Sequence, residues 1–159
     1  MGMKHLFLFE TYTATLNSDY LPVVTDIPHI KSNCERLAEV FLEDLGKNYD
    51  LRSGKKFDKE IGNCAWFTQE FFRWCENQRL PVGIVYFPET KKAKDAHVAP
   101  YVGGLVIDFA HKQFSGNPKE RFKVSEIKEY SKYGYDPTQV DILDEFPNWI
   151  ESVHPLKKK

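Results

Sequence analysis

Residues 97–108 have the sequence His-Val-Ala-Pro-Tyr-Val-Gly-Gly-Leu-Val-Ile-Asp. Two apolar runs flank Gly103-Gly104, and a Gly-Gly pair between such runs is a strong signal for a tight β-hairpin turn. We therefore expect antiparallel strands over residues 96–102 and 105–110. This hairpin is the clearest structural signal in the chain, and the rest of the prediction is built around it.

His97 opens the first of these strands, and Asp108 lies near the end of the second. Their distances from the turn are nearly matched, so an ordinary hairpin register can bring the carboxylate within reach of the imidazole. An imidazole whose tautomer is fixed by a carboxylate is the base that a thiol nucleophile needs. His111 is the local alternative for the base, but it lies beyond the expected end of the strand.

Residues 62–67 read Gly-Asn-Cys-Ala-Trp-Phe, so Cys64 opens an apolar segment directly after a polar loop. The helical spacing of the apolar residues that follow predicts a helix from about residue 64 to 78. Unpaired backbone N–H groups and the helix dipole favour a thiolate at such a position and can also hold an oxyanion. Cys64 could instead be an ordinary buried cysteine, as we expect for Cys34 and Cys75 on apolar helix faces.

The order of the expected elements is helix, helix and then antiparallel strands, which is typical of the α+β class and not of a βαβ repeat. We expect N-terminal helices packed on an antiparallel sheet, in a single domain over residues 1–159. The segment from Gly134 onward has no clear assignment. The other expected elements are a strand over 4–15, a helix capped by Thr25 or Asp26 and ending at about Leu45, an irregular segment over 47–62, a strand over 81–87, and a short helix capped by Ser125 and ending near Tyr133.

The formal net charge of −1 gives no reason to expect nucleic acid or an anionic membrane surface as the main partner. No segment approaches the roughly 20 apolar residues that span a bilayer. The apolar run at residues 6–9 is too short for a signal peptide, so we expect a cytoplasmic protein. The basic run at 157–159 is typical of a solvated, frayed end.

Three cysteines without a CxxC motif argue against a disulfide scaffold. A mixed zinc site is conceivable because His29 lies near Cys34, but the spacings match no standard zinc pattern. We therefore expect no metal or cofactor.

The order of Cys64 at a helix start, His97 on a strand and Asp108 on the next strand resembles that of papain-like and transglutaminase-like cysteine hydrolases. In the family pattern a His strand, a Gly-containing turn and an Ile-Asp strand precede a Gln-Phe pair, here Gln113-Phe114. The pattern also resembles papain-fold bacterial toxins and effectors that deamidate or cleave host proteins. The resemblance covers about residues 60–116. It implies a papain-like or transglutaminase-like core whose Cys-His-Asp triad attacks a peptide or glutamine carboxamide and forms a thioester, without a cofactor.

Two departures from the family leave the reaction type open. Papain has a Gln a few residues before its nucleophile that donates to the oxyanion, whereas residues 57–61 contain none. The second donor is then Asn63, Gln69 or Gln113. The Trp that directly follows the transglutaminase nucleophile stands one position later here, at Trp66. Peptidase, deamidase and transglutaminase chemistry all fit a protein or peptide substrate, and the alternative is a non-catalytic protein-binding module on the same fold.

Overall fold

Two long helices open the part of the chain that the computed structural model describes, which comprises residues 27–51, 63–150 and 156–159. Helix α2 spans Ile27–Leu45 and helix α3 spans Asn63–Asn77. Both predicted helices are thereby confirmed. The strand expected over 4–15 and the two candidate caps of α2 lie outside the described residues.

Five of the described strands form one sheet in which all neighbours are antiparallel, in the order β5-β4-β3-β2-β6. Helices together with an antiparallel sheet agree with the predicted α+β class. The strands are β2 (Gly83–Phe87), β3 (His97–Val102), β4 (Leu105–Asp108), β5 (Lys123–Ser125) and β6 (Asp141–Leu143).

The β3–β4 hairpin turns at Gly103 and Gly104, as the sequence predicts. Their φ angles are 62° and 87°, a conformation that glycine adopts without the steric cost that a Cβ would add. Tyr101 pairs with Val106 and Val102 pairs with Leu105. This register makes His97 and Asp108 diagonal neighbours on adjacent strands.

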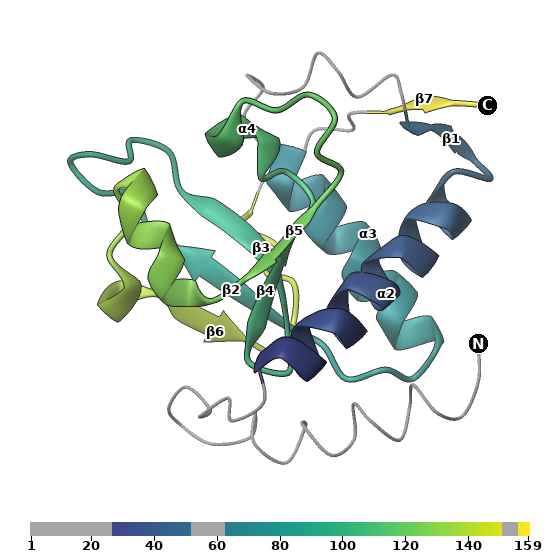
Figure 1. Cartoon of the computed structure of the whole chain (residues 1–159), viewed down its shortest axis with the longest axis horizontal. Coiled ribbons are helices and arrows are strands. Elements are labelled where there is room, and N and C mark those ends of the chain that lie inside the picture. The colour runs from purple at the N-terminus through teal and green to yellow at the C-terminus, as the bar shows by residue number, and fades with distance from the viewer. Residues whose placement is uncertain (1–26, 52–62, 151–155) are drawn as a thin grey trace.

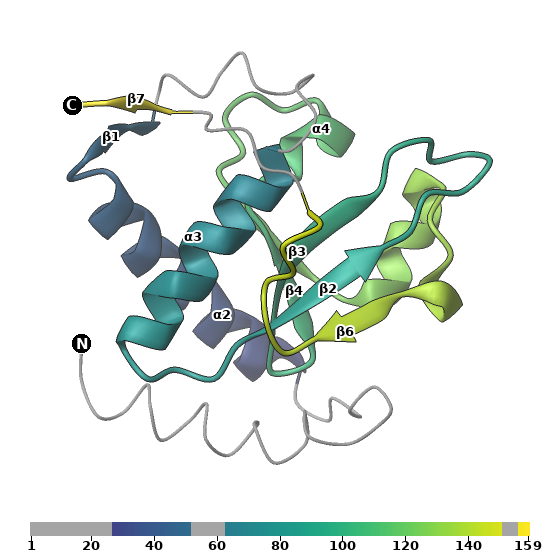
Figure 2. The ribbon, with the colours of Figure 1, turned by 180° about the vertical axis from the view of Figure 1, so that it is seen from behind.

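The sheet lies between two layers of helix, which Figures 1 and 2 show from opposite sides. Helices α2 and α3 cover one face, where Val102 and Ile107 are buried against them. The 3₁₀ helix η2 (Ile127–Tyr133) covers the other face. Because side chains alternate along a strand, His97 and Asp108 project toward η2.

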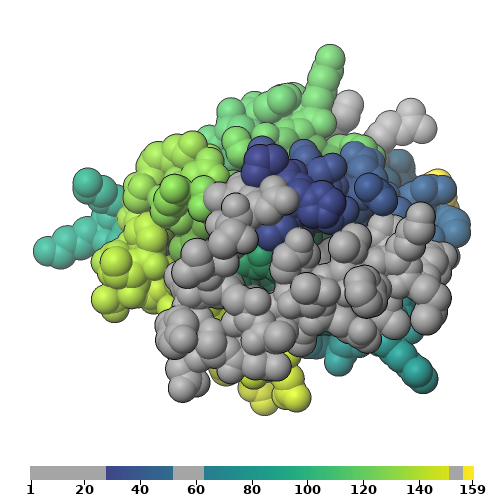
Figure 3. All heavy atoms as spheres, turned by 60° about the horizontal axis from the view of Figure 1, so that its bottom comes forward, coloured from purple at the N-terminus to yellow at the C-terminus, as the bar shows by residue number. Residues whose placement is uncertain are grey.

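Helix α2 packs against β4 and β5 through a stripe of apolar side chains. In Figure 3 the purple atoms of α2 lie next to green atoms from a later part of the chain. The helix ends at Leu45, and the Gly46 N–H closes the last turn by donating to the Leu42 carbonyl at 2.9 Å. No helix of the described ranges is long and apolar enough to cross a bilayer. The predicted stripe is buried throughout and consists of Ile30, Cys34, Leu37, Phe41 and Leu45.

One prediction near the C-terminal end of the sheet is wrong. Ser125 is the last residue of β5 and does not cap the following helix. Glu126 is the cap of η2 instead, in a reciprocal capping box with Glu129. The short helix α4 (Lys112–Ser115) and the edge strand β6 have no counterpart among the predicted elements.

The C-terminal lysines are not frayed. Strand β1 (Tyr49–Asp50) pairs antiparallel with β7 (Lys157–Lys158), and the Lys159 N–H donates to the Asn48 carbonyl at 2.9 Å. The lysine side chains are exposed, as expected. The segment over 47–62 is therefore not irregular at its start, while residues 52–62 lie outside the described ranges.

Gly134 and Gly116 allow a matched test of the packing around η2. Both have positive φ, at 96° and 69°. A Cβ at Gly134 would lie 2.9 Å from the Lys92 Cβ and 3.1 Å from the Ala93 nitrogen, whereas a Cβ at Gly116 meets no atom within 4 Å. We expect Gly116→Ala to lower the free energy of unfolding by about 1 kcal/mol through backbone strain alone, and Gly134→Ala by about 3 kcal/mol. Urea denaturation measures both, and equal losses would contradict the close approach at Gly134.

Candidate active site

Cys64 lies in the first turn of α3, where its side chain is half-buried. The Thr68 hydroxyl lies one turn further along, 2.7 Å from the Cys64 carbonyl and 3.3 Å from the Val98 carbonyl of β3. It can donate to either oxygen, so this buried hydroxyl joins the start of α3 to the start of β3. Thr68 thereby holds Cys64 beside His97, the residue that precedes Val98.

His97 is buried between two acidic partners. Its Nε2 lies 2.7 Å from Oδ2 of Asp108, and its ring is also hydrogen-bonded to the side chain of Cys64. Because Nε2 faces the carboxylate, Nδ1 is the nitrogen that remains for the thiol. The structure therefore brings the thiol of Cys64, the imidazole of His97 and the carboxylate of Asp108 together.

The Asp108 carboxylate is held by donors other than His97. The Tyr130 hydroxyl of η2 donates to Oδ2 at 2.6 Å, and the Ala110 N–H donates to Oδ1 at 2.9 Å. Ser125 in turn hydrogen-bonds the Tyr130 hydroxyl. Tyr130 was not predicted as a site residue, because no neighbouring residue marks its hydroxyl as a buried donor. Its position on the buried side of a capped helix was the one available signal.

Aromatic rings enclose the imidazole of His97. Ring centroids lie at 5.9 Å for Phe87, 5.1 Å for Phe114 and 5.9 Å for Tyr130. His97 and Asp108 are exposed by only 2% and 1%. Little water can screen the pair, so the interaction between the imidazole and its neighbours is stronger than it would be at the surface.

The electrostatics favour a protonated imidazole beside an ionised carboxylate. Burial by itself lowers the pKa of His97, but the negative charge of Asp108 and then that of Cys64, with their hydrogen bonds, outweigh it and raise the pKa to about 10. Burial raises the pKa of Asp108, but His97 and the Tyr130 hydroxyl outweigh it, so the net shift is downward. The pair is thus arranged to hold a positive charge next to the thiol.

The other two cysteines are core residues, as predicted. Cys34 and Cys75 are fully buried. Burial, with a smaller contribution from Glu35, raises the pKa of Cys34 to about 12. Burial also raises the pKa of Cys75 well above its ordinary value. Both are poor nucleophiles at neutral pH.

Gln113 is a candidate oxyanion donor that lies next to His97. It lies on α4 with an exposed side chain, and its Nε2 is 3.4 Å from Nδ1 of His97. Asn63 is the buried first residue of α3, and Gln69 is half-buried further along the same helix. The amide of Gln113 therefore lies at the solvent side of the nitrogen that faces Cys64.

His111 does not compete for the role of base. Its Nδ1 lies 2.7 Å from a Glu120 oxygen, and its Nε2 lies 2.7 Å from the Tyr133 hydroxyl. With both nitrogens engaged in these contacts, His111 has none left for Cys64. It belongs to a separate buried polar contact at the start of α4.

No protein-family model matches this chain, and no curated protein or solved structure matches it. Within residues 27–51, 63–150 and 156–159, no group of three or more His, Cys, Asp or Glu side chains could hold a metal ion. The chemistry of the site has to be inferred from its own geometry.

The raised pKa of His97 can be tested directly. We expect ¹⁵N NMR of the histidine rings to show His97 protonated through the neutral range and deprotonated only toward about pH 10. Asp108→Asn removes the largest influence that raises this pKa, so the ring should lose its proton at a lower pH. Asp95→Asn removes a carboxylate from an exposed position and should leave the titration unchanged. A wild-type His97 that titrates near its ordinary value of 6.5 would contradict the inferred charge state.

Proposed function

We propose that this protein is a cysteine-dependent hydrolase or acyltransferase that acts on a peptide or glutamine carboxamide through a thioester. One observation carries the proposal. The His97 ring is held on Nε2 by Asp108 and is also hydrogen-bonded to Cys64, which lies in the first turn of a helix. A thiol at such a position, next to a base that is itself oriented, is typical of nucleophilic catalysis.

The roles of the three residues follow from the contacts. In the resting site the thiol proton resides on Nδ1 of His97, so that Cys64 is a thiolate beside an imidazolium, and the Cys64 sulfur attacks the carbonyl carbon. Backbone N–H groups at the start of α3 stabilise the oxyanion, with Gln113 as a further donor. His97 then gives its proton to the departing amine or ammonia as the C–N bond breaks, which leaves the thioester. Asp108 keeps the Nε2–H in place and stabilises the imidazolium throughout.

The thioester is common to peptide cleavage, deamidation and transamidation. Water as the acceptor gives a carboxylic acid, whereas an amine gives a new amide. The proposal includes a papain-like or transglutaminase-like core, supported by the helix carrying the nucleophile and the antiparallel strands carrying the base and the carboxylate. The described cysteines are all free, which suits a thiol enzyme in the reducing cytoplasm.

Alkylation with iodoacetamide tests the nucleophile without knowledge of the substrate. At about pH 6 we expect Cys64 to be modified at least about 100-fold faster than Cys34 or Cys75, because only Cys64 lies beside an imidazolium. Peptide mapping by mass spectrometry gives the three rates, and Cys64→Ser should remove the fast reaction in a protein that stays folded. Three slow and similar thiols would instead favour a non-catalytic protein-binding module.

The role of Asp108 is tested by the pH dependence of the same reaction. Asp108→Asn lowers the pKa of His97, so the imidazolium that supports the thiolate is lost at a lower pH. We expect alkylation of Cys64 at about pH 6 to slow by about tenfold, which corresponds to about 1.4 kcal/mol. Asp95→Asn is the control with the same change of charge. An unchanged profile in folded Asp108→Asn protein would make Asp108 a structural strand residue and leave at most a Cys–His dyad.

A further inference from the structure

Cys64 borders a group of half-buried apolar side chains on the α3 face of the sheet. Tyr86 of β2 and Phe146 and Ile150 of the segment after β6 pack against the same buried cluster as Cys64. In Figure 2 this segment, drawn in yellow, runs from β6 across the sheet toward the start of α3. The nucleophile therefore lies at the border of an apolar surface that solvent partly reaches.

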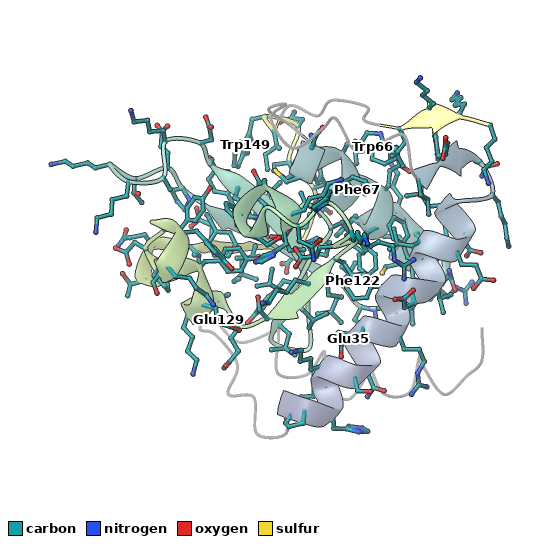
Figure 4. All side chains as sticks on the ribbon, turned by 45° about the horizontal axis from the view of Figure 1, so that its top comes forward. Glu35, Trp66, Phe67, Phe122, Glu129 and Trp149 are labelled. Carbon is teal, nitrogen blue, oxygen red and sulfur yellow. The ribbon has the colours of Figure 1, made fainter. Side chains whose placement is uncertain are left out.

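Trp149 extends this surface outward. Its side chain, labelled in Figure 4, is 58% exposed. It contacts the Tyr86 ring edge-to-face, with centroids 5.0 Å apart. Of the large apolar side chains in the described ranges, only Trp149 and Ile142 are exposed. Ile142 pairs with Val85, whose side chain points toward η2, so Ile142 lies on the opposite face from Cys64. Trp149 is thus the exposed apolar anchor on the side of the nucleophile.

The rim of this surface is acidic. Asp141, Asp144 and Glu145 are exposed, and residues 141–150 contain no lysine or arginine. The ion pairs of the described residues involve none of these three carboxylates. Their negative potential favours a partner that carries a positive charge next to its apolar group.

We propose that the surface formed by Tyr86, Phe146, Trp149 and Ile150 binds the polypeptide substrate of Cys64. It takes an aromatic or large aliphatic side chain next to the reacting carboxamide, and the acidic rim takes a neighbouring lysine or arginine. This inference rests on the proposed function. A chain advances by about 3.3–3.6 Å per residue, so a substrate whose carbonyl reaches Cys64 must place its adjacent residues on the bordering surface. Exposed aromatic rings such as Trp149 supply contact area at low entropic cost.

Two probes with the same reactive group separate this surface from the chemistry of the thiol. Iodoacetyl-phenylalaninamide and iodoacetyl-glycinamide both alkylate cysteine, and they differ only in the benzyl group. We expect the phenylalanine probe to modify Cys64 about tenfold faster, since burying part of a phenyl ring is worth about 1.4 kcal/mol. Equal rates for the two probes in the wild-type protein would overturn the proposal.

Substitutions at Trp149 and Ile142 test which surface produces the preference for the phenylalanine probe. Trp149→Ala should reduce the ratio of the two rates several-fold while leaving the rate of the glycine probe unchanged, and Trp149→Phe should preserve most of the ratio. Ile142→Ala removes the other exposed apolar side chain, on the opposite face, and should change neither rate. A ratio that survives Trp149→Ala, or that falls equally in Ile142→Ala, would overturn the proposal.

A second pair of probes, which differ in charge, tests the acidic rim. Iodoacetyl-Phe-Lys-amide should react several-fold faster than iodoacetyl-Phe-Glu-amide at low salt, and the double variant Asp144→Asn/Glu145→Gln should reduce the difference. No preference for lysine would overturn this part of the proposal. Failure of the proposed function has a different signature, because the glycine probe would then react with Cys64 no faster than with an ordinary thiol. The phenylalanine-to-glycine ratio still decides the substrate surface in that case.

Discussion

The hydrogen bond between His97 and Asp108 is the constraint around which the η2 face of the sheet is organised. Removing two ionisable groups from water is costly unless their remaining hydrogen-bonding positions are filled. The structure fills those of Asp108 with the Tyr130 hydroxyl and the Ala110 N–H. Aromatic rings cover the pair from outside. A buried pair satisfied in this way fixes the imidazole in one orientation.

The site depends on both layers that cover the sheet. Helix α3 contributes Cys64 from one layer, and η2 contributes Tyr130 from the other. The strands between them supply the base and the carboxylate. Neither the hairpin alone nor a helix packed on it would complete the arrangement, because the Cys64 thiol and the hydroxyl that fixes Asp108 approach from opposite sides. This explains why a seven-residue 3₁₀ helix with its own capping box lies so close to the site.

The sequence predicted the elements whose signals are local. The Gly103-Gly104 turn, the helical spacing after Cys64 and the stripe of α2 depend on neighbouring residues only, and the structure has each of them. From these elements, the proximity of His97 to Asp108 also followed, because a hairpin register is short-range geometry. The predicted cap of η2, Ser125, is one position too early, because Glu126 takes the capping role after the end of β5.

What the sequence could not predict depends on partners far along the chain. Strand β6 is a short edge strand of which two residues are exposed, and it is held by pairing with β2 and by the packing of Leu143 against a buried cluster. The lysines of β7 have no strand signal of their own and are ordered by pairing with β1. Thr68 and Tyr130 likewise acquire their roles only when the folded chain brings a carbonyl or a carboxylate to their hydroxyls. Propensity and periodicity carry no information about such contacts.

The contact of the Thr68 hydroxyl with both α3 and β3 has a consequence for the time course of folding. The Thr68–Val98 contact joins residues 30 apart in sequence, whereas the His97–Asp108 contact spans 11 within one hairpin. Contacts of short separation form early, and those that close longer loops form later. A refolding chain should therefore acquire its base–carboxylate pair before α3 docks. Until that docking, the thiol of Cys64 has no imidazolium beside it, so any reactivity that the imidazolium confers on this thiol appears only when the tertiary structure around it is complete.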